Sequence, residues 1–137
     1  MTECVFCKIV KNKLKAYRVY EDKDVLAIAP LKKTILSKRQ LLLMPKKHYE
    51  NIYTIPNKEL CNLIKATKKI SLKMRKLFDA EGINILHASG KAAQQSVFHI
   101  HFHLIPRYKH DNIDAWPHNK YVEHQYLQIY KNMNLNE

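Results

Sequence analysis

The sequence predicts an α+β fold with a mainly antiparallel sheet, because several short apolar segments bounded by turn residues accompany one long stretch of helical periodicity. The helical stretch covers residues 58–79, and the extended segments lie near residues 17–29, 41–44, 83–87 and 97–105. No repeat, linker or low-complexity segment divides the chain, so a single domain over residues 1–137 is expected.

The composition favours a folded, soluble chain with an excess of positive charge. Hydrophobic residues make up 46% and charged residues 26%, and 24 Lys and Arg against 12 Asp and Glu give a formal charge of +12. This charge favours anionic partners such as nucleotides. The lysines are spread along the whole chain, so compositional bias is the better explanation of this charge. Because a pattern of interleaved aromatic and basic residues is lacking, no nucleic-acid partner is expected.

The sequence also lacks the marks of a membrane or secreted protein. No apolar run approaches the roughly 18 residues that are needed to cross a bilayer. The residues after Met1 form neither a basic nor an apolar leader segment. A cytoplasmic location without membrane contact is therefore expected.

Turn residues and prolines set the limits of the first expected strands. Two short extended pieces within residues 17–29 flank a turn at Glu21–Asp24, and the second piece ends at Pro30. Leu41–Met44 is an apolar run stopped by Pro45, which is typical of a central strand. The basic segment between these strands is expected to be irregular.

One long helix is expected over residues 58–79, followed by a strand at Ile83–His87. Asn57 is the predicted N-cap of this helix and Gly82 its stop signal. A final short helix is expected over residues 119–132. The apolar stripe of the long helix comprises Leu60, Leu63, Ile64, Ile70, Met74, Leu77 and Phe78.

Residues 96–106 carry three histidines at alternating positions of a strand that is expected over residues 97–105. Successive side chains of a strand point to opposite faces, so His99, His101 and His103 share one face, with neighbouring rings roughly 7 Å apart. Three histidines with this period are hard to explain by core packing and indicate a functional site. The opposite face carries the apolar residues Phe98, Ile100, Phe102 and Leu104, which belong in a core.

Two chemical uses fit this row of imidazoles. Alternating histidines can bind a metal directly, or one imidazole can attack phosphorus while its neighbours contact phosphate oxygens. The preceding loop, Ser89–Ser96, contains a turn, small residues, an amide and a hydroxyl, which suit phosphate binding through N–H and side-chain donors. This loop favours the phosphorus chemistry.

These residues resemble the histidine triad (HIT) family. The family motif, His-x-His-x-His followed by two apolar residues, matches His99–Ile105, and the resemblance covers most of the chain. It implies a HIT-like α+β fold with a short N-terminal helix, a homodimer and a nucleoside phosphate substrate. The other matching segments are Cys4–Val10, Met44–His48, the long helix, Gly82–Asn84, Gln95–Phe98 and Pro106–Tyr108.

The resemblance also implies a role for each residue of the site. His101 matches the nucleophile, which attacks the α-phosphorus and forms a covalent nucleotidyl-histidine that water hydrolyses. The other ring nitrogen of His101 needs an acceptor, and a backbone carbonyl is expected. His103 would contact phosphate oxygens, Ser96 would donate toward the leaving group, and His99 completes the catalytic set. The expected substrate-binding residues are Gln95, Ile28, Asn84 and Gly90, and Gln95 is expected to position the phosphate loop.

Cys4 and Cys7 form a Cys-x-x-Cys pair, for which the residues alone leave a redox pair, a zinc half-site and two free thiols open. The lack of a thioredoxin-like setting makes the redox pair the weakest of these. Some members of the resembled family complete a zinc site with the counterparts of His48 and His99. Because a Cys2His2 set closes a tetrahedron around zinc, the expected cofactor is a structural zinc ion, with no organic cofactor.

Several positions depart from the family pattern and alter the expected grip on the substrate. Ala27 stands where an acidic residue contacts the ribose, and Arg39 and Gln40 replace a Gly-His pair. Ala88 replaces a polar amide, and Gln94 replaces a glycine and is expected to crowd the phosphate loop.

Two functions follow from this mixture of matches and departures. The first is a hydrolase or transferase that acts on the α-phosphate of nucleoside phosphoramidates or dinucleoside polyphosphates. The second is a degenerate nucleotide-binding or protein-interaction module with little turnover. The presence of Ser96 and all the histidines of the motif favours the enzyme.

Overall fold

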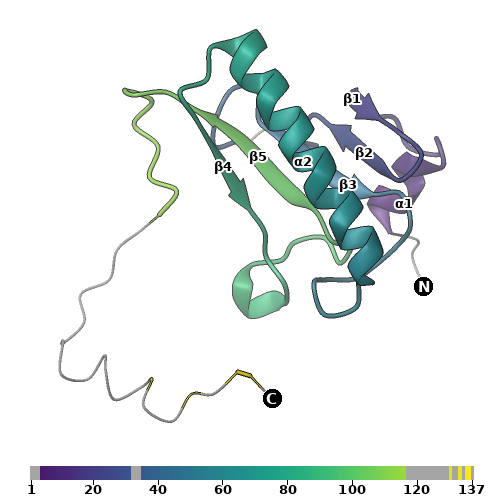
Figure 1. Cartoon of the computed structure of the whole chain (residues 1–137). Helices are drawn as coiled ribbons and strands as arrows, with labels where there is room; N and C mark the ends of the chain where they lie inside the picture. Colours follow the sequence, from purple (N-terminus) through teal and green to yellow (C-terminus); the bar gives the residue numbers. More distant parts are fainter. Residues whose placement is uncertain (1–3, 32–34, 117–129, 131–132, 134, 137) are drawn as a thin grey trace.

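The chain folds into a five-stranded antiparallel sheet with a long helix and a short N-terminal helix, as the sequence predicts (Figure 1). The computed structural model describes residues 4–31, 35–116, 130, 133, 135 and 136. The helix expected over residues 119–132 falls outside this part of the chain, except for Tyr130. The elements are α1 Val5–Val10, β1 Arg18–Glu21, β2 Val25–Ile28, β3 Leu41–Pro45, α2 Asn57–Phe78, β4 Gly82–Leu86, the 3-10 turn η1 Lys91–Ala93 and β5 Phe102–Arg107.

The strands lie in the order β1-β2-β3-β5-β4, which places β3 at the centre, as its apolar run predicts. In the register of the sheet, Ala27 is opposite Leu43 and Leu43 is opposite Phe102. On the other side of β5, the last pair joins Leu86 to His103. The strand that carries His103 is therefore held between β3 and β4.

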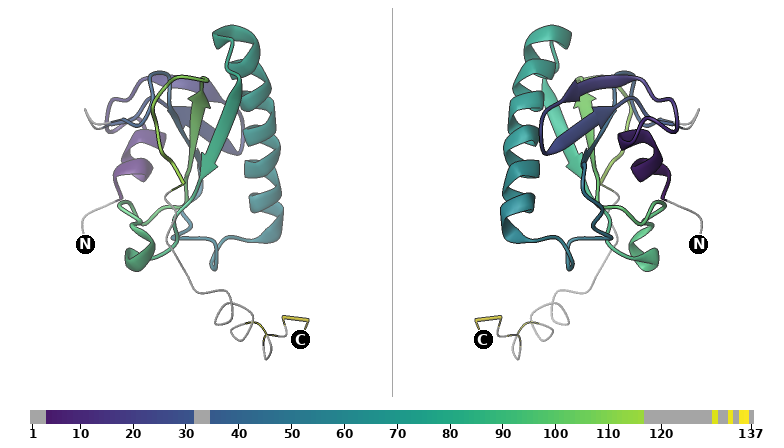
Figure 2. Two further views of the ribbon diagram at one scale, coloured as in Figure 1. Left: turned by 90° about the vertical axis from the view of Figure 1, so that its left-hand side faces the viewer. Right: turned by 90° about the vertical axis from the view of Figure 1, so that its right-hand side faces the viewer.

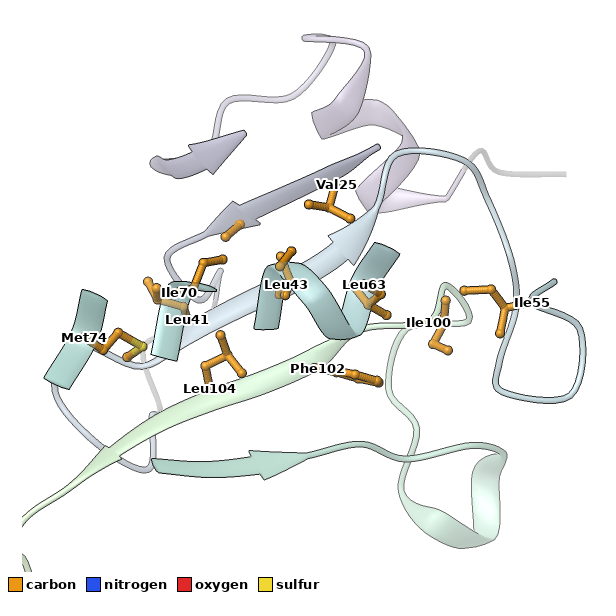
Figure 3. Packing of buried hydrophobic residues seen from close by; sticks show 12 residues of the cluster. Val25, Leu41, Leu43, Ile55, Leu63, Ile70, Met74, Ile100, Phe102 and Leu104 are labelled. Carbon is orange, nitrogen blue, oxygen red and sulfur yellow. The ribbon is translucent and has the colours of Figure 1, made fainter. Parts of the chain in front are cut away.

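Both faces of β2 and β3 are buried, because α2 covers one face of the sheet and α1 the other (Figure 2). Leu41 and Leu43 point into the larger core beneath α2, together with Leu104 of β5 (Figure 3). The alternate residues Leu42 and Met44 point into the smaller core beneath α1. This alternation explains why both strands consist of unbroken apolar residues.

Three side chains fix α1 against the sheet. Phe6 and Ile9 are its buried residues and pack in the smaller core. The guanidinium of Arg18 on β1 donates 2.6 Å hydrogen bonds to the carbonyl of Ile9 and to Oδ1 of Asn12, where the helix ends. These contacts hold the short helix next to the histidines. The ring of Phe6 contacts the ring of His101 edge-on, with 5.1 Å between the centroids.

Each end of α2 differs by one residue from the predicted one. Pro56, with an extended backbone, is the N-cap, and Asn57 is the first helical residue. The helix stops at Asp79, whose left-handed backbone (φ 51°, ψ 35°) ends the hydrogen-bond pattern. The prediction of Gly82 as the stop signal was wrong, because Gly82 already opens β4. An Asp in the left-handed region is tolerated, which makes it a weaker sequence signal than glycine.

The apolar stripe of α2 is narrower than predicted. Leu63, Ile70 and Met74 are buried, whereas Ile64 and Leu77 are exposed on the flank of the helix. The small residues Ala66 and Thr67 complete the buried face instead. Leu60 and Phe78 are partly buried at its margins.

The strand of the histidines begins later than predicted. β5 starts at Phe102, and residues 97–101 approach it without sheet pairing. The reason is a change of partner, because the N–H of Ile100 donates to the carbonyl of Tyr49 at 2.7 Å rather than to a neighbouring strand. Phe98, predicted to be in the core, is 36% exposed, whereas Ile100, Phe102 and Leu104 are buried as predicted.

Within the described residues, no helix is long and apolar enough to span a membrane.

The two isoleucines of α2 provide a test of this packing. Ile70 is 4% exposed and Ile64 is 50% exposed. Ile70→Ala removes buried contacts and should lower the free energy of unfolding by about 2–4 kcal/mol. Ile64→Ala is the matched control on the same helix and should change it by less than about 1 kcal/mol. Urea unfolding followed by circular dichroism measures both, and equal losses would contradict this assignment of the buried face.

Candidate functional site

The ring of His101 is held by the backbone of its own chain. Its Nδ1 lies 2.8 Å from the carbonyl oxygen of His99, which matches the expected carbonyl acceptor. Because a carbonyl only accepts, Nδ1 must carry the hydrogen, and Nε2 keeps its lone pair. Burial lowers the pKa of His101 and so favours this neutral form. Within the described residues, no hydrogen bond occupies its Nε2.

The ring of His103 lies beside that of His101, with 5.1 Å between the centroids. Burial is the main cause that lowers the pKa of His103 to about 4, and the neighbouring His101 and His87 add to it. Its Nδ1 lies 3.0 Å from Nε2 of Gln40, the residue immediately before β3. The ring is therefore neutral at pH 7 and anchored on one side.

A cavity of about 120 Å³ lies next to these two rings. Its volume is sufficient for a phosphate group, and its wall combines two imidazoles and Ser96 with apolar side chains. A larger hollow of about 460 Å³, between residues 36–39 and 108–113, contains none of the three histidines. The smaller cavity is therefore the candidate site. It is lined by Phe6, Pro30, Leu31, Gln40, Leu42, Ser96, Val97, His101 and His103.

Gln95 is buried and holds the loop that precedes the histidines. Its Oε1 accepts the N–H of Gly90 at 2.7 Å, and its Nε2 donates to the carbonyls of Glu50 at 2.6 Å and Val97 at 3.1 Å. Gly90 takes a positive φ of 90° at the start of the turn η1, a conformation that glycine adopts readily. These contacts are those of a residue that positions the loop. Among the described residues that line the cavity, neither Gln95 nor Gly90 occurs.

Gln94, expected to crowd the phosphate loop, does not line the cavity either. Its backbone is left-handed (φ 65°) and its side chain is exposed. The side chain thus points to solvent, and the replacement of glycine adds backbone strain at this position rather than bulk in the site.

Two of the expected substrate-binding residues lie away from the cavity. Ile28 is fully buried in the smaller core, behind Phe6 and Leu42, which line the cavity. Asn84 lies on β4, where its Oδ1 accepts a hydrogen bond from Arg107. The structure therefore does not bring these two residues to the cavity. The tertiary packing of β2 and β4, which a residue pattern does not specify, is the reason.

The departures at Ala27 and Ala88 have different surroundings. Ala27 is fully buried in the core beneath α2, so this position presents no group to the cavity. Ala88 is half-buried in the segment between β4 and the turn η1, and it does not line the cavity. Of the basic segment before β3, Lys32 and Lys33 lie outside the described residues.

His87 is a site residue that the sequence reasoning missed. Its Nδ1 lies 3.0 Å from the carbonyl oxygen of His101, and its Nε2 lies 2.7 Å from Oγ of Ser89. The same Oγ accepts the N–H of Ile52 at 3.0 Å, so its proton is free to bond Nε2, and Nδ1–H donates to the carbonyl. His87 thus fixes the backbone of His101 just beyond the last β4–β5 pair. The available signal was a histidine at the end of the predicted strand Ile83–His87.

The second missed residue, Gln40, was noted in the sequence only as a departure from a family pattern. Its contact with His103 spans 63 positions of the chain. A polar residue directly before a buried strand was the signal for it, because the side chain of such a residue has to find a partner inside the protein.

Cys4, Cys7, His48 and His99 meet at the start of α1. The ligand atoms of this Cys/His cluster all lie within 4.8 Å of one another. Nδ1 of His99 is 3.6 Å from each Sγ, and Sγ of Cys7 is 3.3 Å from Nδ1 of His48. Ligands bound to a tetrahedral zinc ion at 2.0–2.3 Å are roughly 3.3–3.8 Å apart. The cluster can therefore hold a metal ion of this size.

His99 is prepared for such a role by its other ring nitrogen. Its Nε2 lies 2.8 Å from the carbonyl oxygen of Pro45, which accepts and so places the hydrogen on Nε2. Nδ1 is then left with its lone pair toward the cysteines. Burial lowers the pKa of His99 to about 4, which keeps the ring neutral, as a metal ligand must be.

The comparison with known proteins identifies the family. The model of the HIT domain matches residues 11–110. The chain belongs to the HIT family. This HIT protein is 46% identical to a HIT-like protein of Methanocaldococcus jannaschii over 79% of its own length and 81% of that protein. It is 32% identical to an adenosine 5'-monophosphoramidase of Saccharomyces cerevisiae over 83% of its own length and 70% of that protein.

A solved structure agrees with the fold of this HIT protein. The crystal structure of a zinc-bound histidine triad family protein from Mycobacterium smegmatis is 33% identical, with a TM-score of 0.77. The match covers 82% of this chain and 81% of that one. The HIT fold and the HIT motif are thus supported by independent comparisons.

The buried neutral His103 should make the stability of the HIT protein depend on pH. Its pKa of about 4 lies below the 6.5 of an exposed histidine, so between these values the unfolded chain binds a proton that the folded one excludes. The contribution is therefore complete above pH 6.5 and is lost as the pH falls toward 4. Allowing for partial exposure, His103→Asn should reduce this loss by roughly 2 kcal/mol.

Urea unfolding at pH 7 and pH 4.5 measures this difference. The exposed His110 supplies the control, because His110→Asn should leave the loss of stability with falling pH as in the wild type. An identical loss in wild type and His103→Asn would show that His103 is not excluded from protonation in the folded state.

Proposed function

We propose that this protein is a nucleotide hydrolase or transferase in which Nε2 of His101 attacks the α-phosphorus of a nucleoside phosphoramidate or dinucleoside polyphosphate. The observation that carries the proposal is the 2.8 Å contact between Nδ1 of His101 and the carbonyl of His99, beside the phosphate-sized cavity. It leaves a lone pair on Nε2 for attack. Membership of a family that includes adenosine 5'-monophosphoramidases supports a nucleotide substrate.

The reaction has two balanced steps. In the first, Nε2 of His101 forms a bond to phosphorus, and the P–N or P–O bond to the leaving group breaks. The leaving group takes a proton, and we assign the hydroxyl of Ser96 as the donor of this proton. In the second, the oxygen of water bonds to phosphorus and the bond between phosphorus and Nε2 breaks, while one proton of the water restores the hydroxyl of Ser96; the products are a nucleoside monophosphate and free His101. The carbonyl of His99 stabilises the positive ring that forms in between.

A degenerate, weakly active nucleotide-binding or protein-interaction module is the second candidate function. Two observations favour it. The cavity of about 120 Å³ is smaller than a typical small-molecule site, and Ala27 offers no acceptor to a ribose. The presence of the complete histidine motif with a defined proton on His101 outweighs them.

We also propose a single domain that forms a homodimer. Within the described residues, β4 pairs only with β5, so its outer edge is unpaired, and Ile85 on this strand is exposed. An open edge with an apolar side chain suits pairing with a second copy. Light scattering of the purified chain measures the mass, and a monomer at micromolar concentration would reject the dimer. The cytoplasmic location stays a prediction.

Replacement of the proposed nucleophile tests the function. His101→Ala should lower kcat/KM for an adenosine phosphoramidate by about 1000-fold or more, because it removes the group that is proposed to form the covalent intermediate. The exposed His110 supplies the control, and His110→Ala should turn over the substrate like the wild type. Release of adenosine monophosphate is followed by chromatography. If wild type and His101→Ala are equally inert but bind the nucleotide, the binding module is the correct function.

We further propose that the Cys/His cluster holds a structural zinc ion. Zinc there would pin the start of α1 to His99, whose carbonyl in turn holds His101. Among the described residues that line the cavity of His101 and His103, none belongs to the Cys/His cluster. This separation fits a structural ion.

Metal analysis tests the zinc proposal. The purified wild type should contain about one zinc ion per chain. Cys7→Ser should lose the ion and melt at a lower temperature, because a ligand is removed. The exposed Cys61 lies outside the cluster, and Cys61→Ser should retain the ion. A stably folded wild type without metal would reject the proposal.

A further inference from the structure

We propose that Gln40 is a positioning residue that keeps the ring proton of His103 on Nε2, so that His103 donates this N–H to a phosphate oxygen in the cavity. The proposal rests on the proposed function, because it assigns how the phosphate-contacting histidine of that site is set. It assigns a function to the glutamine immediately before β3.

The orientation of the Gln40 amide follows from its first partner. The side chain is buried, and the backbone N–H of Leu36 points at its Oε1 with a distance of 3.0 Å. A backbone N–H can only donate, so the amide atom that faces Leu36 has to be the oxygen. The NH2 group of Gln40 is therefore on the other side, 3.0 Å from Nδ1 of His103.

The orientation of the amide decides the tautomer of His103. An NH2 group can only donate, so Nδ1 of His103 has to accept and carries no hydrogen. A neutral imidazole has one ring hydrogen, which is then on Nε2. Because His103 lines the cavity, this tautomer offers an N–H donor to an anion bound there.

Other protonation states of His103 leave two donors facing each other. A hydrogen on Nδ1 would meet the NH2 group of Gln40. Rotating the amide would relieve that contact but would place the NH2 group against the N–H of Leu36. The low pKa of His103 agrees with the exclusion of the cation. Its titratable neighbours are His101 and His87, both of which lower that pKa.

Neighbouring rings thus receive opposite tautomers from opposite partners. The carbonyl of His99 accepts from His101, which leaves a lone pair on Nε2 for attack. The NH2 group of Gln40 donates to His103, which leaves a hydrogen on Nε2 for binding. Two identical side chains, 5.1 Å apart, can therefore serve as nucleophile and as donor in one cavity.

Nitrogen NMR of the full-length, 15N-histidine-labelled protein tests the proposal directly. Long-range 1H–15N spectra distinguish the two tautomers, and we expect the hydrogen of His103 on Nε2 and that of His101 on Nδ1. In Gln40→Glu a carboxylate replaces the amide and can accept from both Leu36 and His103. The hydrogen of His103 should then move to Nδ1 and its pKa should rise, while His101 stays unchanged.

A matched variant separates this effect from that of added charge. Gln94 is exposed directly after the turn η1, and Gln94→Glu adds the same charge without a contact to His103. The ring-nitrogen shifts of His103 should be as in the wild type in this variant. A third variant, Gln40→Met, removes the donor without adding charge, and it should give a mixture of both His103 tautomers.

The pH profile of turnover supplies a kinetic readout that a purely structural role would not change. In Gln40→Glu, His103 is a cation at pH values below its raised pKa and keeps the hydrogen on Nε2. At pH values above that pKa the ring is neutral with its hydrogen on Nδ1, so that Nε2 presents a lone pair to the phosphate. The kcat for an adenosine phosphoramidate should therefore fall by about 100-fold as the pH rises through that pKa, the loss of one phosphate donor. The wild type should show no such step.

The outcomes for this proposal and for the proposed function can be told apart. A wild type with the hydrogen of His103 on Nδ1, or a Gln40→Glu variant with wild-type shifts at His103, would overturn the role of Gln40 whatever the activity. An inert wild type with the hydrogen on Nε2 would reject the hydrolase and still support the role of Gln40.

Discussion

The hydrogen bond from Nδ1 of His101 to the carbonyl of His99 is the interaction on which the rest of the site depends. It joins residues two positions apart, so it exists only if the backbone between them keeps one conformation. The surrounding structure provides that conformation: Ile100 bonds to Tyr49, and His87 bonds to the carbonyl of His101. The backbone is thus held on both sides of the ring that is proposed to attack phosphorus.

The histidines of the motif differ in chemistry because they differ in partners. A carbonyl oxygen faces Nε2 of His99 and Nδ1 of His101, and an amide NH2 faces Nδ1 of His103. The ring atom that remains is the one proposed to be a metal ligand in His99, a nucleophile in His101 and a donor in His103. Burial adds to each assignment, because it lowers the pKa of all three rings and removes the cation, for which both nitrogens are donors.

The fold supplies these partners from distant parts of the chain. Pro45 ends the central strand, Gln40 precedes it, and α1 brings the cysteines to the buried His99. The two cores on either side of β3 fix the distance between these elements. A tightly packed interior resists small displacements of its elements. The packing of β2, β3 and β5 therefore fixes the distances of the hydrogen bonds in the site.

The sequence by itself determined the α+β class, the mainly antiparallel sheet of short apolar strands and the long helix. It also determined that three histidines occur at alternating positions. These features depend on the local periodicity of the residues. Only the tertiary structure decided which nitrogen of His99 and of His103 is free, because that depends on Pro45 and Gln40, far from the motif along the chain. It also decided that β5 starts at Phe102 and that Ile28 and Asn84 are turned away from the cavity. Residue patterns predict which side chains a segment offers, whereas hydrogen-bond partners are chosen by the packing of segments against one another.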